Sequence, residues 1–227
     1  FVAGYGISAG LIAGFESIIS TYFQPKFYKD INSVNIDDQS RAWNEYAQAV
    51  LPSLILTSIL IMSTAPDLTK LLLGSNFRES AQFILWGSLA ELSRVIIGVF
   101  ALASHARMNT KMLLLPNMVG AIISVLLIWY FIPLYGSNGV GLGLVFSYIL
   151  SLLLTIRVTQ KNLLVTLPQK QFMKCLIMGG GLFVTSEVLR EVLGYGEGYL
   201  ISILILSIVG ILFLFFQYLI LRPLLQR

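Results

Sequence analysis

The chain is poor in the residues from which disulfides and metal centres are built. Among its 227 residues there is one cysteine, Cys175, and one histidine, His105. A single cysteine rules out an internal disulfide or a cysteine-based metal cluster, and a single histidine leaves no histidine pair for a metal. The sequence also lacks the HExxH, Cys-x-x-Cys and Gly-Lys-Ser/Thr motifs. We therefore expect a protein that is not an enzyme and that needs no metal or organic cofactor.

Charged residues are also scarce. They make up 11% of the chain, while hydrophobic residues make up 56%. A soluble domain carries about a quarter charged residues. The net charge is only +4. These values indicate a polytopic membrane protein, for which we expect the lipid bilayer, and no nucleic acid, as the environment and partner.

Seven segments are long and apolar enough to cross the hydrocarbon core, which takes about 20 residues of helix. They cover residues 1–23, 46–73, 80–104, 112–132, 139–156, 172–189 and 199–221. The sixth is the weakest because it contains Gly179-Gly180-Gly181, and Pro133 is expected to end the fourth. In lipid, only helices satisfy their own backbone over such lengths. We predict an all-α polytopic membrane bundle of about seven transmembrane helices, with residues 24–45 as an interfacial helix or loop.

Lysine and arginine fall mostly into alternate connections. Eleven lie between segments 1 and 2, 3 and 4, or 5 and 6, or after segment 7: Lys26, Lys29, Arg41, Arg107, Lys111, Arg157, Lys161, Lys170, Lys174, Arg222 and Arg227. The other connections hold Lys70, Arg78 and Arg190, and Arg94 lies inside segment 3. Cytoplasmic loops are enriched in lysine and arginine. We therefore predict a multi-pass protein of the inner (cytoplasmic) membrane with a cytoplasmic C-terminus.

One face of the third segment is small and polar. Its members recur every three or four residues, as on one side of a helix: Ser80, Ile84, Gly87, Glu91, Arg94, Gly98, Ala101 and His105. Ionisable groups at membrane depth are costly and often mark a substrate or ion path. Glu91 and Arg94 are thus candidate cavity residues, or else a neutralised structural pair. Asn117 on the fourth segment is a third candidate, whereas Glu16 is predicted to be interfacial.

Small residues recur at four-residue intervals in two segments. They are Gly139, Gly143, Ser147 and Ser151 in the fifth, and Gly6, Gly10 and Gly14 in the first. This spacing predicts close crossings between helices. Gln217, a single polar residue in the seventh segment, is predicted to form a hydrogen bond between helices.

Two stretches resemble bacterial polysaccharide flippases. TAPDLTKLLLGSNFRESAQFI is similar to their pattern of an apolar helix, a proline, a short amphipathic turn and an alanine-rich helix. ALASHARMNTKMLLLPNMVGAIISVLLIWYFIPLYGSNGVGLGLVFSYILSLLL is similar to their small basic turn, a helix with asparagine and glycine, Ile-Pro-x-Tyr-Gly and a glycine-rich helix start. Over about residues 4–161 the chain thus resembles the multidrug/oligosaccharidyl-lipid/polysaccharide superfamily.

The resemblance implies an organisation and a function. Members have two six-helix lobes, often with two further helices at the C-terminus. Residues 1–161 are then expected to be most of the second lobe and 162–227 the added pair, without the N-terminal lobe of the same protein. The implied function is translocation of an oligosaccharide on an undecaprenyl-type lipid carrier, for O-antigen, capsule or exopolysaccharide synthesis. Arg94 would meet the carrier's pyrophosphate, helped by Asn117, while Glu91 would hold Arg94 or carry a coupling proton.

Other functions stay open on the residues alone. A cation-coupled multidrug exporter of the same superfamily would use Glu91 as the site of H⁺, Na⁺ or a drug cation. A membrane scaffold without transport would use Glu91 and Arg94 as architecture. The sequence also departs from the flippase pattern in one respect, because flippase cavities are often lined by several basic residues and here only Arg94 lies deep.

Overall fold

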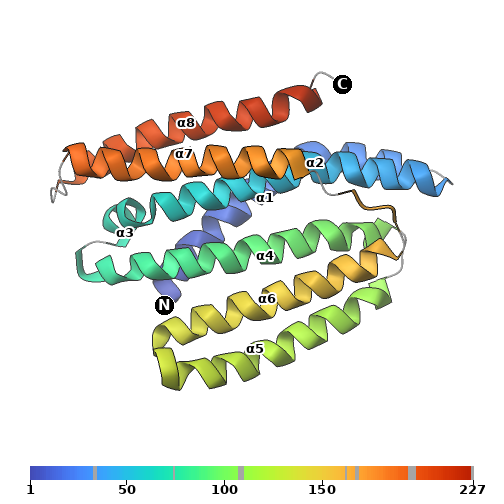
Figure 1. Cartoon of the computed structure of the whole chain (residues 1–227), viewed down its shortest axis with the longest axis horizontal. Helices are drawn as coiled ribbons and strands as arrows, with labels where there is room; N and C mark the ends of the chain where they lie inside the picture. The colour runs from blue at the N-terminus through green and yellow to red at the C-terminus, as the bar shows by residue number, and fades with distance from the viewer. Residues whose placement is uncertain are drawn as a thin grey trace. The chain divides into compact units, whose positions relative to one another are not determined.

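A computed structural model describes residues 1–32, 35–73, 75–106, 110–161, 163–166, 169–193 and 198–225. Within these ranges the chain forms eight α-helices and two short 3-10 helices, with no strand (Figure 1). They are α1 (Val2–Ile31), α2 (Ile36–Ser63), α3 (Ala65–Leu73), η1 (Ser75–Ser80), α4 (Ala81–Ala106), η2 (Thr110–Leu113), α5 (Leu114–Tyr135), α6 (Ser137–Gln160), α7 (Gln169–Leu193) and α8 (Tyr199–Leu225). The predicted all-α fold is confirmed.

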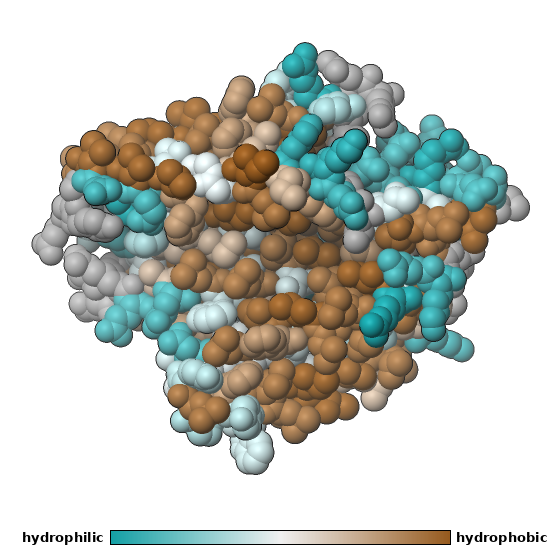
Figure 2. Space-filling view, in the orientation of Figure 1, coloured by the Kyte–Doolittle hydropathy of each residue, from teal (hydrophilic) through white to brown (hydrophobic). Residues whose placement is uncertain are grey.

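All of the α-helices except α3 are long and apolar enough to cross a membrane, which gives seven candidate spans. Large apolar side chains such as Trp129, Val192 and Leu200 are exposed, and apolar residues cover much of the face seen in Figure 2. An apolar surface of this extent is unfavourable in water and is solvated by lipid. The chain is a multi-pass membrane protein.

The stretch between the first two predicted segments is mostly helical, because α1 runs to Ile31 and α2 starts at Ile36. Phe27 and Ile31 are buried, and the Phe27 ring lies 5.1 Å from that of Tyr46. Asn35 caps α2, since its Oδ1 accepts a hydrogen bond from the backbone N–H of Asp37 at 3.1 Å. Tertiary packing and this cap extend both helices beyond the predicted limits.

The prediction of one helix over residues 46–73 is wrong. The helix α2 ends at Ser63, and the short helix α3 begins at Ala65. Pro66 lies at this break, and a proline cannot donate the backbone hydrogen bond that would continue α2.

Two other helix boundaries also differ from the prediction. Pro133 does not end α5, which continues to Tyr135 and stops at Gly136, whose φ is 58° and whose N–H bonds the carbonyl of Ile132 at 2.9 Å. A glycine with positive φ is a common helix terminator. The three glycines in α7 do not interrupt it; Gly179 lies against Ile59 of α2, where a Cβ would clash with that side chain.

The chain forms two compact units. Unit 1 comprises Phe1–Ala13, Pro52–Ser88 and Gln169–Arg227, and unit 2 comprises Gly14–Leu51 and Leu89–Pro168. The assignment of residues 1–161 and 162–227 to a transporter lobe and an added helix pair stays a prediction, because it concerns a two-lobe protein rather than packing within this chain.

Within unit 1, the hydrogen bond predicted for Gln217 is confirmed. Its Nε2 donates to the carbonyl of Ser53 at 2.9 Å and joins α8 to α2. The α7–α8 hairpin, seen at the red end of Figure 1, also contacts α2 through Cys175, whose Sγ lies 3.5 Å from the carbonyl of Pro52.

Within unit 2, α5 and α6 form an antiparallel hairpin with a close crossing (Figure 1). A Cβ on Gly143 would lie 2.8 Å from the backbone nitrogen of Ile128. Ser151 donates to the carbonyl of Pro116 at 3.2 Å. The close packing predicted for the small residues of α6 is therefore confirmed.

The same prediction is wrong for α1. A Cβ on Gly6, Gly10 or Gly14 would meet no atom of the described neighbours within 4 Å. These glycines therefore pack against none of the helices described in the chain.

Candidate functional site

The helix α4 places Glu91 and Arg94 one turn apart. Arg94 Nε donates to Glu91 Oε2 at 2.5 Å. The Glu91 side chain is 7% exposed and that of Arg94 is 41% exposed. The two candidates do pair, as the spacing predicts, and their role as cavity residues stays a prediction.

Sequence analysis missed a third member, Glu16 of α1. Arg94 Nη2 donates to Glu16 Oε2 at 3.1 Å, so Arg94 bridges carboxylates on two helices. The interfacial placement of Glu16 stays a prediction, although its premise is corrected, because α1 does not end near residue 23. Since α1 runs from Val2 to Ile31, Glu16 lies at its middle. The sequence does carry one signal for a longer helix: Phe27 and Ile31 are apolar residues four positions apart, as on one face of a helix that continues beyond residue 23.

The surroundings of these three residues involve further helices. A Cβ on Gly98 of α4 would lie 3.9 Å from Glu16 Oε1, so this position of α4 lies beside the Glu16 carboxylate. The phenol of Tyr148 on α6 lies within electrostatic range of Glu91 and Arg94. The small face predicted for this part of α4 therefore meets charged and polar groups of α1 and α6 rather than an aliphatic surface.

We call Glu16, Glu91 and Arg94 the Arg94 cluster. It holds two carboxylates and one guanidinium, so its formal charge is −1 when all three groups are ionised. Its members differ in access, because Glu16 is 30% exposed and Arg94 41%, against 7% for Glu91. The cluster is thus buried at Glu91 and partly exposed at Glu16.

The remaining candidate, Asn117, is not joined to this cluster. It is an exposed residue of α5. Among the described residues, no hydrogen bond or ion pair connects it with Arg94 or Glu91. The neighbouring Gly120 instead packs on Ser151 of α6.

A second charged cluster lies in unit 1, around Arg190 of α7. Arg190 donates from Nε and Nη2 to Asp67 Oδ2 at 3.1 and 2.7 Å, and from Nη1 to Glu187 Oε1 at 2.5 Å. Its Nη2 also bonds the carbonyl of Ser63, at the C-terminal end of α2, at 2.5 Å. Arg190 therefore binds both sides of the α2–α3 break, and a cation at a helix C-terminus is favourable. We call Asp67, Glu187 and Arg190 the Arg190 cluster.

The placement of Arg190 in a connection is wrong, while its side of the membrane stays a prediction. The predicted segment stops at residue 189, whereas α7 continues to Leu193. The side chains of Arg190 and Asp67 are 7% and 8% exposed, so this ion pair is sealed inside unit 1.

The two clusters have the same local pattern. In each, a glutamate precedes an arginine by three residues on one helix, and the arginine reaches a second carboxylate on another helix. Both hold two carboxylates and one guanidinium. They differ in the access of the arginine, which is 41% exposed for Arg94 and 7% for Arg190. A sealed pair is typical of architecture, while an open charged group at membrane depth is typical of function.

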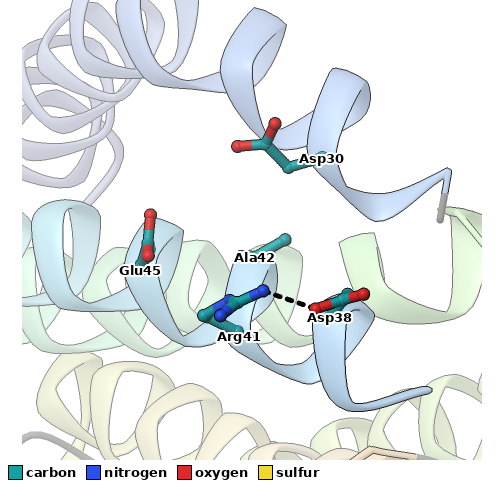
Figure 3. Close-up of a pocket in the computed structure, with 5 residues that line it drawn as sticks. All are labelled: Asp30, Asp38, Arg41, Ala42 and Glu45. Carbon is teal, nitrogen blue, oxygen red and sulfur yellow. Dashed lines mark hydrogen bonds and ion pairs between the residues drawn. The ribbon is translucent and has the colours of Figure 1, made fainter. Parts of the chain in front are cut away.

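A cavity of about 320 Å³ lies between the end of α1 and the start of α2, lined by Asp30, Asp38, Arg41, Ala42 and Glu45 (Figure 3). Arg41 is paired with Asp38, and Lys26 lies 3.4 Å from Glu45. These pairs are exposed, and exposed ion pairs contribute little to stability.

Residues 6–10, Gly-Ile-Ser-Ala-Gly, have the spacing of a hydrolase nucleophile motif. That motif needs a sharp strand-to-helix turn that exposes the serine. Here the five residues lie inside α1, and the buried Ser8 donates to the carbonyl of Tyr5 at 2.8 Å. The match therefore has no nucleophilic geometry.

No protein-family model, curated protein or solved structure matches the chain. The resemblance to polysaccharide flippases consequently rests on the two sequence stretches alone. The geometry of the Arg94 cluster does not depend on that resemblance.

Proposed function

We propose that the protein is a membrane transporter that translocates a lipid-linked oligosaccharide across the cytoplasmic membrane for surface-polysaccharide synthesis. In this proposal it works by alternating access, in which a polar cleft opens to one side of the membrane and then to the other. The lipid tail stays in the bilayer while the sugar head crosses through the cleft. The seven apolar helices and the flippase-like stretches support this function.

The observation that carries the proposal is the partly exposed side chain of Arg94. An architectural arginine is expected to be sealed by its partners, as Arg190 is near the C-terminal end of α7. Arg94 instead keeps 41% of its side chain exposed, although it binds two carboxylates. A planar guanidinium that stays charged at any working pH is well suited to a phosphate or pyrophosphate group. Arg94 is accordingly the residue that we assign to the anionic head of the lipid carrier, with Glu91 holding it in place.

A second candidate function is favoured by the charge of the same cluster. Two carboxylates against one guanidinium leave a surplus negative charge, which suits a proton, a sodium ion or a cationic drug. A cation-coupled exporter would use this surplus, with Glu91 or Glu16 as the ion site. Such a protein would not depend on the guanidinium geometry of Arg94, because a lysine would balance the carboxylates equally well.

The test uses Arg94→Lys in the gene of the producing cells, with Arg190→Lys as the matched control. If Arg94 binds pyrophosphate bidentately, Arg94→Lys lowers surface-polysaccharide export by about tenfold, or 1.4 kcal/mol of transition-state free energy, at a normal amount of protein in the membrane. Arg190→Lys is expected to lower the amount of protein instead, because it breaks a sealed hydrogen-bond network.

Normal export by the Arg94 variants would contradict this assignment. If Arg94→Lys and the double variant Glu91→Ala with Arg94→Ala both accumulate and export normally, then the Arg94 cluster is architecture. The assignment of Arg94 to the anionic head of the lipid carrier would then be refuted.

A further inference from the structure

We propose that Glu16 is an exchangeable partner of Arg94: a phosphate group that binds Arg94 displaces the Glu16 carboxylate, and the released carboxylate takes up a proton. This inference rests on the proposed function, because it requires an anionic substrate group at Arg94. It adds that substrate binding and proton uptake are linked through one named residue.

The geometry distinguishes the two carboxylates of the cluster. Glu91 is on the same helix as Arg94, is 7% exposed and binds Nε at 2.5 Å. Glu16 is on another helix, is 30% exposed and binds Nη2 at 3.1 Å. A phosphate that binds the Nη2 end of the guanidinium therefore takes the position where Glu16 now binds. Glu91 keeps the Nε side and fixes the orientation of the guanidinium.

The charges then determine what happens to Glu16. With one cation and two carboxylates, the cluster already carries a surplus negative charge, and a phosphate adds at least one more. Among the described residues facing Glu16, the charged groups are Arg94 and Glu91 of α4, and the phenols of Tyr46 on α2 and Tyr148 on α6 lie within electrostatic range of the cluster. Arg94 is the one cation in this set. A carboxylate that loses this cation at membrane depth is costly, and a proton is the smallest group that neutralises it.

The exchange balances without a covalent step. The hydrogen bond from Arg94 Nη2 to Glu16 breaks, an equivalent bond to a phosphate oxygen forms, and one proton moves from water to the Glu16 carboxylate. Release of the phosphate reverses both changes. By linkage, protons then strengthen phosphate binding and phosphate strengthens proton binding by the same factor.

The experiment is calorimetric titration of the full chain in lipid nanodiscs with farnesyl pyrophosphate, a soluble lipid pyrophosphate. Repeating it in buffers with different ionisation enthalpies gives the protons taken up per bound ligand. We expect the wild type to take up roughly one more proton than Glu16→Gln, since linkage counts only protons bound differently in the two states. Protonation of the ligand itself cancels in this difference. Glu45→Gln, an exposed carboxylate paired with Lys26, is the matched control and is expected to behave as the wild type.

The outcomes separate this inference from the proposed function. No binding to the wild type would overturn both. Binding with equal proton uptake in the wild type and Glu16→Gln would overturn the exchange and leave Arg94 as the anion site. If Glu16→Gln does not fold, infrared difference spectra of the wild type decide the question. A new band of a protonated carboxyl on ligand addition supports the exchange, and its absence overturns it.

Discussion

Replacing Arg190 by methionine should destabilise unit 1 strongly, although Arg190 lies in a stretch with three glutamates that resembles a polar connection. The variant leaves the Asp67 carboxyl group buried without its cation, with a side chain only 8% exposed. It also removes the donor to the carbonyl of Ser63. The contact with Glu187 counts for little, because that carboxylate is 45% exposed. Removing one partner of a buried pair costs about 3–5 kcal/mol, and we assign most of this loss to Asp67.

The assay is reversible unfolding of the detergent-solubilised protein by increasing fractions of SDS, followed by far-UV circular dichroism. The double variant Arg190→Met with Asp67→Asn should recover part of the loss, because no buried carboxylate is then left without its cation. The reasoning would be refuted by a single variant that loses under about 1 kcal/mol, the range of an exposed pair. Losses that simply add in the double variant would also refute it, since they would mean that the two residues do not interact.

Two further predictions concern topology and packing. In a Cys175→Ser background, Ser137→Cys should be labelled by an impermeant thiol reagent on intact cells, whereas Thr110→Cys should not. Both positions are exposed, and the distribution of lysine and arginine places Thr110 on the cytoplasmic side of the membrane and Ser137 on the outer side. Labelling of position 110 but not of position 137 would invert the topology. Gly143→Leu should lower the folded yield more than Leu142→Ala, because a side chain at Gly143 meets the backbone of Ile128 at 2.8 Å; equal yields would show that the close crossing of α5 and α6 does not matter.

The Glu91–Arg94 pair could be predicted because it depends on local geometry. Residues three apart on a helix share a face, and this holds whatever the helix packs against. The small residues of α6 were predictable for a similar reason, since their regular spacing defines one side of the helix.

The partners of the two arginines could not be predicted in the same way. Arg94 reaches Glu16 from 78 residues away, and Arg190 reaches Asp67 from 123 residues away. Contacts over such separations depend on how helices pack and on where they end. The predicted C-terminal ends of α1 and α7 were both too early. The length of an apolar run indicates only the part of a helix that crosses the hydrocarbon core, and a helix can continue beyond that part. The helix α1 continues beyond it through the buried Phe27 and Ile31.

In the proposed transporter, the exposed side of Arg94 faces water and receives an anionic group. The most direct measurement is thiol labelling of Gly98→Cys in a Cys175→Ser background, since this position lies beside Glu16. Ser186→Cys is the control, because Ser186 of α7 is fully buried. We expect that a polar thiol reagent labels position 98 in membranes, that farnesyl pyrophosphate slows this labelling, and that position 186 stays unlabelled. Absence of labelling at position 98, or a rate that farnesyl pyrophosphate leaves unchanged, would contradict it.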